Sequence, residues 1–171
     1  MMTPLVLTVI APDKPGLVEL LSQTIVDNGG NWLESSMSRL AGKFAGILIV
    51  SVAEEKAETL IEALQKLESQ GLRVIVARSP TYETSADSNN ITLALIGHDK
   101  PGIVREISQA LSRFNINVER LSTELVSGSM SAEELFKADA DLTVPAGVDL
   151  DDLQQSLEAI ANDLMVDITL N

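Results

Sequence analysis

The tetrapeptide DKPG occurs twice in this sequence, at positions 13–16 and again, 86 positions later, at 99–102. Each copy follows an apolar run and precedes apolar residues at helical spacing. The runs LVLTVIAP and ITLALIGH, which stand before the two copies, align as well. After them Val18 aligns with Val104, Ser22 with Ser108, Gln23 with Gln109 and Asn31 with Asn117. Self-similarity of this extent indicates a tandem duplication, so we expect two units of the same fold.

Each half predicts the same order of elements. An almost wholly apolar, β-rich run, as expected of a central strand, is followed by an apolar helical pattern, two strands, a second helical pattern and a closing strand. The strands are expected at 5–11, 32–40, 44–52 and 72–77 in the first half, and at 91–97, 118–125, 135–144 and 165–170 in the second. The order βαββαβ predicts an α+β fold of the ferredoxin-like type, an antiparallel sheet with two helices on one face.

A polar stretch rich in serine and asparagine, SPTYETSADSNN, separates the two halves. Such composition is typical of a linker. We therefore expect a first domain at 1–80, a linker at 81–90 and a second domain at 91–171.

The charge is strongly negative and unevenly distributed. The formal net charge is −13. Residues 1–80 carry 7 basic and 9 acidic side chains, whereas residues 91–171 carry 5 and 14. A protein that binds nucleic acid directly needs lysine and arginine gathered against phosphates, and this sequence has no such cluster. We expect no direct binding to nucleic acid.

Several other classes of function find little support. The chain has no cysteine and one histidine, His98, so it cannot provide the usual nitrogen and sulfur ligands of a metal site. No nucleophile motif accompanies that histidine, and we expect neither an enzyme nor a cofactor. No run approaches the roughly 20 apolar residues that span a membrane, and the N-terminus does not resemble a signal peptide. A cytoplasmic protein is expected.

The DKPG corner has two explanations that the sequence leaves open. Proline suits the first position of a helix, and an aspartate two residues before it can accept hydrogen bonds from free backbone N–H groups, so DKPG can be a strand-to-helix cap and nothing more. The same helix end can also bind a carboxylate, because glycine lets a ligand approach the backbone. Asn31 and Asn117 begin the strand after each first helix, and we expect them near the same end of the sheet.

The βαββαβ unit with D-K-P-G-[LI]-V after its first strand resembles the ACT domain, a small-molecule-sensing module that usually binds amino acids. The tandem pair, its length and its acidic second half resemble the glycine cleavage system transcriptional repressor family, as does the segment 130–145. Ligands of ACT pairs commonly sit at the interface between units. Carried over to this sequence, the resemblance implies as ligand-binding residues Asp13, Gly16, Leu17 and Asn31, and Asp99, Gly102, Ile103 and Asn117.

The resemblance implies a regulator of glycine cleavage genes that responds to a small amino acid such as glycine and acts on a DNA-binding activator by protein contact. The alternative is a regulatory subunit that gives amino-acid feedback control of a metabolic enzyme. Exposed edge strands are compatible with a homo-oligomer. His98 precedes the second DKPG, and it either contacts a ligand or is a solvated loop residue.

Overall fold

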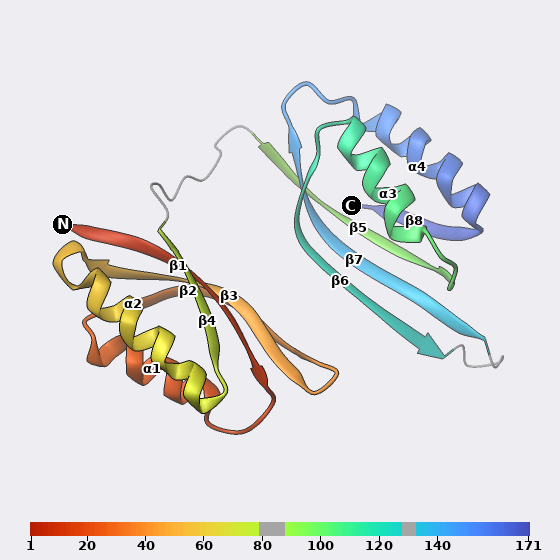
Figure 1. The fold of residues 1–171 in the computed structure, drawn as a ribbon. Coiled ribbons are helices and arrows are strands. Elements are labelled where there is room, and N and C mark those ends of the chain that lie inside the picture. The colour runs from red at the N-terminus through yellow and green to blue at the C-terminus, as the bar shows by residue number, and fades with distance from the viewer. Residues whose placement is uncertain (79–87, 128–132) are drawn as a thin grey trace. The chain divides into compact units, whose positions relative to one another are not determined.

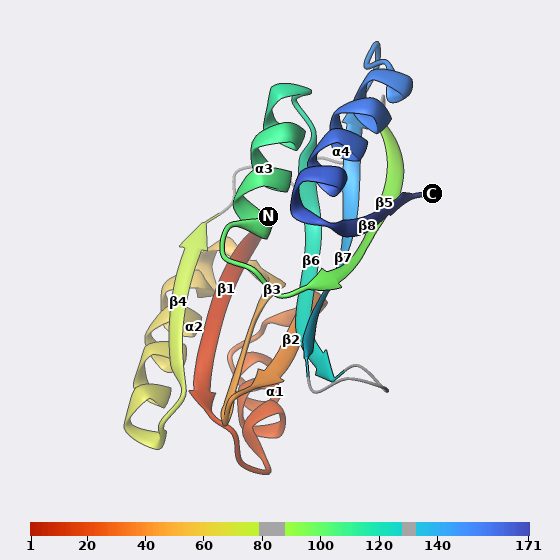
Figure 2. The same cartoon turned by 90° about the vertical axis from the view of Figure 1, so that its right-hand side faces the viewer.

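In a computed structural model, which describes residues 1–78, 88–127 and 133–171, the chain divides into two compact units, Met1–Thr84 and Ser85–Asn171 (Figure 1). Each unit is a four-stranded antiparallel sheet with its helices on one face, as Figures 1 and 2 show. This confirms the predicted α+β, ferredoxin-like architecture. No helix among the described residues is long and apolar enough to cross a membrane.

The first unit follows the predicted order of elements. It contains β1 (Met2–Pro12), α1 (Leu17–Asp27), β2 (Asn31–Leu40), β3 (Lys43–Ala53), the 3-10 turn η1 (Glu54–Lys56), α2 (Ala57–Gln65), the 3-10 turn η2 (Lys66–Gln70) and β4 (Arg73–Arg78). The strands lie in the order β2-β3-β1-β4, so the first and last strands of the unit are neighbours. Glycine ends the first helix: Asn28 is its C-cap and Gly29 follows with φ +79°.

The second unit repeats this topology. It contains β5 (Ser88–His98), α3 (Ile103–Arg113), β6 (Asn117–Ser127), β7 (Glu134–Pro145), α4 (Leu150–Leu164) and β8 (Val166–Leu170), with the strands in the order β6-β7-β5-β8. β5 already begins at Ser88, so the last three residues of the expected linker belong to a strand. The rest of that linker, 81–87, lies outside the described residues. Residues 128–132 of the second hairpin also lie outside them.

Each unit has its own apolar core between sheet and helices. In the first unit the alternate β1 residues Leu5, Leu7 and Val9 are fully buried, and Leu21 and Ile25 of α1 pack against them. The second unit buries the corresponding side chains in a separate cluster. Because side chains of a strand alternate between faces, the other residues of the apolar run in β1 lie on the helix-free face of the sheet.

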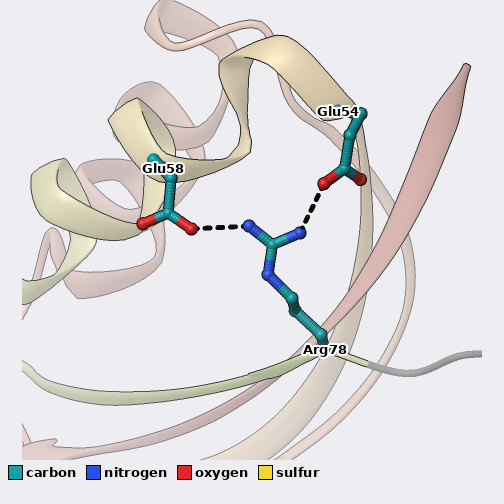
Figure 3. A network of polar contacts seen from close by, with 3 residues as sticks. All are labelled: Glu54, Glu58 and Arg78. Carbon is teal, nitrogen blue, oxygen red and sulfur yellow. Dashed lines mark hydrogen bonds and ion pairs between the residues drawn. The ribbon is translucent and has the colours of Figure 1, made fainter.

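A network of three charged side chains joins the last strand of the first unit to its second helix (Figure 3). Arg78, at the end of β4, donates hydrogen bonds to Glu54 at 2.7 Å and to Glu58 at 2.6 Å. Hydrogen bonds from the side chains of Thr3 and Arg78 hold the pKa of Glu54 below its ordinary value. Thr3 belongs to β1 and Arg78 to β4, so the network connects these two neighbouring strands to the start of α2.

Candidate ligand-binding corners

The DKPG corner connects the first strand of each unit to its first helix, and its backbone makes the same contact in both. The N–H of Asp13 donates to the carbonyl of Gly42 at 3.0 Å, and the N–H of Asp99 donates to the carbonyl of Glu134 at 3.3 Å. Both acceptors belong to the hairpin that joins the second and third strands of the unit. The hairpin thus fixes where the chain leaves the sheet.

The lysine of DKPG binds the far end of the second helical segment. The Nζ atom of Lys14 lies 3.4 Å from the carbonyl oxygen of Gln70, the last residue of η2, and that of Lys100 lies 3.0 Å from the carbonyl oxygen of Leu164, the last residue of α4. The C-terminal carbonyls of a helix are unpaired and carry partial negative charge, which favours a cation there. This lysine is therefore a structural residue in both corners.

The glycine of DKPG is the N-cap of the following helix and lies in the left-handed region, with φ +90° for Gly16 and +92° for Gly102. Helix α1 begins at Leu17 and α3 at Ile103, one residue after the glycine. The expectation that proline takes the first helical position is therefore wrong, because Pro15 and Pro101 lie in a turn and the glycine separates each of them from the helix. A glycine N-cap has no side chain with which to accept from the first-turn N–H groups.

The corner is open above Gly16. A Cβ atom built on Gly16 would meet no atom within 4 Å, and one on Gly102 would meet only Arg105 Nη2, at 3.7 Å. The flanking residues Asp13 and Asp99 are exposed. The first-turn N–H groups and this open space together form a place where a small anion can approach the backbone.

The two corners differ in the charged groups around the aspartate. The carboxylate of Asp13 accepts from Arg39 Nη1 at 3.4 Å. Arg39 pairs with Phe44, and the matching pair in the second sheet is Leu125 with Phe136, so an apolar residue takes the place of the arginine. The second corner instead has His98, whose Nδ1 lies 3.0 Å from a carboxylate oxygen of Glu133.

The asparagines do not lie beside the corner of their own unit, and the expectation that they would is wrong. Asn31 pairs with Ser51, which pairs with Pro4, whereas the corner follows Pro12. Eight strand residues separate the two ends, a distance of about 27 Å. Helix α1 runs antiparallel to β1 and carries the chain back to the start of the sheet. Asn117 lies in the same way, opposite Thr143 and Asn90.

Leu17 and Ile103 are core residues, only 5% and 3% exposed. Their side chains fill the space under the helix start, so they can offer a ligand only their backbone N–H groups. The corner therefore brings together Asp13 and Gly16 with the amide of Leu17, and Asp99 and Gly102 with that of Ile103.

Sequence reasoning missed Arg39 as a partner of Asp13. A usable signal was present, because the predicted hairpin around 41–43 sets the register of β2 against β3, and β3 pairs with β1. Counting along that register places Arg39 beside the end of β1. Among the described residues, no group of three or more histidine, cysteine, aspartate or glutamate side chains is arranged to hold a metal ion.

Comparison with known proteins identifies relatives of both units. A family model described as the ACT domain matches residues 3–76. A glycine cleavage system transcriptional repressor from Escherichia coli is 22% identical along 98% of this chain, and the alignment covers 88% of that protein. The UPF0237 protein MJ1558 of Methanocaldococcus jannaschii is 31% identical over 85 residues, which cover 48% of this chain and 94% of that protein.

A solved structure of an unknown protein from Galdieria sulphuraria has the same fold. Its TM-score is 0.89 at 24% identity, and the match covers 100% of this chain and 98% of that one.

Proposed function

The chain belongs to the ACT-domain family, and we propose that it is a regulator that responds to a small amino acid and acts by binding another protein. The observation that carries this proposal is the similarity along 98% of the chain to a glycine cleavage system transcriptional repressor. The finer proposal follows from that similarity: the chain regulates glycine cleavage genes through a DNA-binding activator, and its ligand is glycine.

The geometry of the corners supports an amino acid as the ligand. The first-turn N–H groups of α1 can bind the carboxylate of an amino acid, and the exposed carboxylate of Asp13 can bind its ammonium group. The open space above Gly16 leaves room for a ligand of this size. The second corner offers the same two groups, without a counterpart of Arg39.

The charge distribution supports action through a protein and not through DNA. The chain carries a net charge of −13, and a polyanion repels the phosphates of DNA unless basic residues gather on one face. A partner that itself binds DNA removes this obstacle.

Calorimetric titration of the full chain with glycine, serine and alanine tests the ligand. We expect glycine to bind, and Asp13→Asn to weaken its binding roughly tenfold, because the neutral amide can accept a hydrogen bond from the ammonium group but lacks the opposite charge of the carboxylate. Asp27→Asn, at the other end of α1, is the matched control and should leave the affinity unchanged. Wild-type chain that binds none of the three amino acids contradicts the proposal.

Variants of the asparagines test whether they share that ligand. No amino acid reaches both Asp13 and Asn31 within one unit. Loss of glycine binding in Asn31→Ala or Asn117→Ala, as well as in Asp13→Asn, would mean that one ligand contacts two different units. Unchanged affinity in both asparagine variants would remove them from the proposed site.

Affinity capture from cell extract, with and without glycine, tests the partner. We expect glycine to change the amount of a DNA-binding activator that the immobilised chain retains, and the Asp13→Asn variant to lose that response. A metabolic enzyme captured in a glycine-dependent way would instead support the alternative, feedback control of that enzyme.

A further inference from the structure

The helix-free faces of the two sheets follow one pattern of pairing but differ in chemistry. In the first sheet the outward side chains of β3, β1 and β4 form three rows: Ile49, Val6 and Ala77; Ile47, Thr8 and Ile75; and Ala45, Ile10 and Arg73. Ile75 is 69% exposed, Ile47 56% and Ile10 43%. A shallow hollow of 270 Å³ is lined by Val6, Ile47 and Ile49 together with Glu34, Ser35 and Ser36 of β2. We call the nine residues of the three rows the first helix-free face.

The second sheet has polar and acidic residues at the matching positions. Its three rows are Asp141, Thr92 and Asn171; Asp139, Ala94 and Thr169; and Lys137, Ile96 and Asp167. Asp139 thus stands where the first sheet has Ile47, and Asp141 where it has Ile49. Arg120 pairs with Asp141 at 2.8 Å, and these side chains line a hollow of 350 Å³.

The fold itself therefore does not require isoleucine on this face. Both units bury the same layers of leucine, isoleucine and valine between sheet and helices, and the second unit does so with a polar outer face. Contiguous exposed apolar residues on one copy of a duplicated fold, replaced by charges on the other, mark a contact surface of that copy.

We propose that the first helix-free face binds the same face of a second copy of this chain, forming a two-fold symmetric dimer in which two sheets pack face to face. Packing of this kind needs an apolar face on both partners, and a two-fold axis supplies the same face twice. An acidic face like that of the second unit is a poor cover, because burying Asp139 or Asp141 against isoleucine leaves a charge without compensation.

Charge favours this face for self-association. Residues 1–80 carry 7 of the 12 basic side chains and a net charge of only −2, so two first units meet with little repulsion.

Sedimentation equilibrium of the full chain from about 2 to about 200 µM tests the proposal, because this range covers the affinity of a modest interface. We expect the mass to approach twice 18.3 kDa as the concentration rises. Ile47→Asp, which installs the residue of the matching position in the second sheet, should weaken the dimer at least about 100-fold. Ile75→Thr installs the residue type of Thr169, which has the matching position in the second sheet. It should weaken the dimer less than Ile47→Asp, and threonine still favours a β-strand.

Val26→Asp is the matched control, because Val26 is 66% exposed on α1 and lies on the helix side of the sheet. It should leave the dimer intact. Circular dichroism checks that each variant is folded. A wild-type chain that stays monomeric at about 200 µM overturns the proposal. The face would then be covered by another partner or by another part of the chain. A dimer that survives both Ile47→Asp and Ile75→Thr overturns it as well.

Discussion

The guanidinium group of Arg78 lies 2.6 Å from the carboxylate of Glu58, so the last residue of β4 is bound to the first turn of α2. The same guanidinium contacts Glu54, and the hydrogen bonds that it donates to both glutamates raise the pKa of Arg78, with Glu58 contributing most. β4 is an edge strand and pairs only with β1. The network therefore gives this edge of the first sheet a second attachment, to α2.

Replacing Arg78 by glutamine should lower the melting temperature slightly at neutral pH, because exposed ion pairs contribute little individually and more as a network. The pKa of Glu54 is lowered in the folded state, so its contribution is present above its ordinary value of 4.5 and is lost as the pH falls through the folded pKa. The difference in melting temperature between wild type and Arg78→Gln should therefore shrink below about pH 4.5.

Arg73→Gln is the control for this measurement, because Arg73 contacts Glu68 at 3.7 Å and both side chains are about 70% exposed. Arg73→Gln should change the melting temperature less than Arg78→Gln, and this change should not depend on the protonation of Glu54. A difference between Arg78→Gln and wild type that stays constant from pH 7 to pH 3 contradicts the prediction.

Replacing Gly16 by alanine should destabilise the first unit by about 1–2 kcal/mol, because an L-residue with a Cβ is strained at φ +90°. No clash contributes, since the space around the glycine is open. Gly16→Asn should lose less, because asparagine adopts left-handed conformations more readily than alanine. Thermal unfolding of both variants checks this, and an alanine variant as stable as wild type would show that the corner relaxes to another conformation.

Replacing the lysines of the two corners by methionine should have unequal effects. Lys100 is half-buried and its bond to the Leu164 carbonyl is 3.0 Å long, so Lys100→Met should cost about 1 kcal/mol. Lys14 is exposed and its contact with the Gln70 carbonyl is 3.4 Å, so Lys14→Met should cost only a few tenths of that amount. Denaturant unfolding compares the two variants, and equal losses would contradict the structural difference.

Gly46 pairs with Met37 of β2, and its replacement by alanine should be the most damaging of these changes. A Cβ atom there would approach the backbone carbonyl oxygen of Ser36 and the Cα atom of Met37, which are backbone atoms that cannot rotate away. The loss should be about 3 kcal/mol or more. Gly42→Ala is the control, because no atom lies within 4 Å of its Cβ position. A Gly46→Ala variant no less stable than Gly42→Ala contradicts this packing.

The elements of the fold could be predicted because the chain contains the same pattern twice, once in each unit. The ends of the strands could not, because backbone pairing continues beyond the apolar run. Asn89 and Asn90 are polar, which favours a linker, yet they pair with Val144 and Thr143 of β7. Backbone hydrogen bonds between strands need only an extended neighbour, and hydrophobicity does not report them.

The corner was predicted in position but not in conformation. The residues of DKPG fit a proline at the first helical position equally well, and tertiary contacts decide against it. The Asp13 N–H binds the hairpin, Lys14 contacts the end of η2, and Gly16 between these contacts and the helix lies in the left-handed region. Such contacts between distant segments are not visible in a local sequence pattern.

The pairing of first and last strands also determines when each unit can fold during synthesis on the ribosome. In the first unit Leu5 pairs with Arg78, and in the second Leu93 pairs with Leu170. Neither sheet can be completed until its closing strand has left the exit tunnel. The first unit therefore finishes folding while the second is still being translated, and its apolar outer face is available before the acidic half of the chain exists.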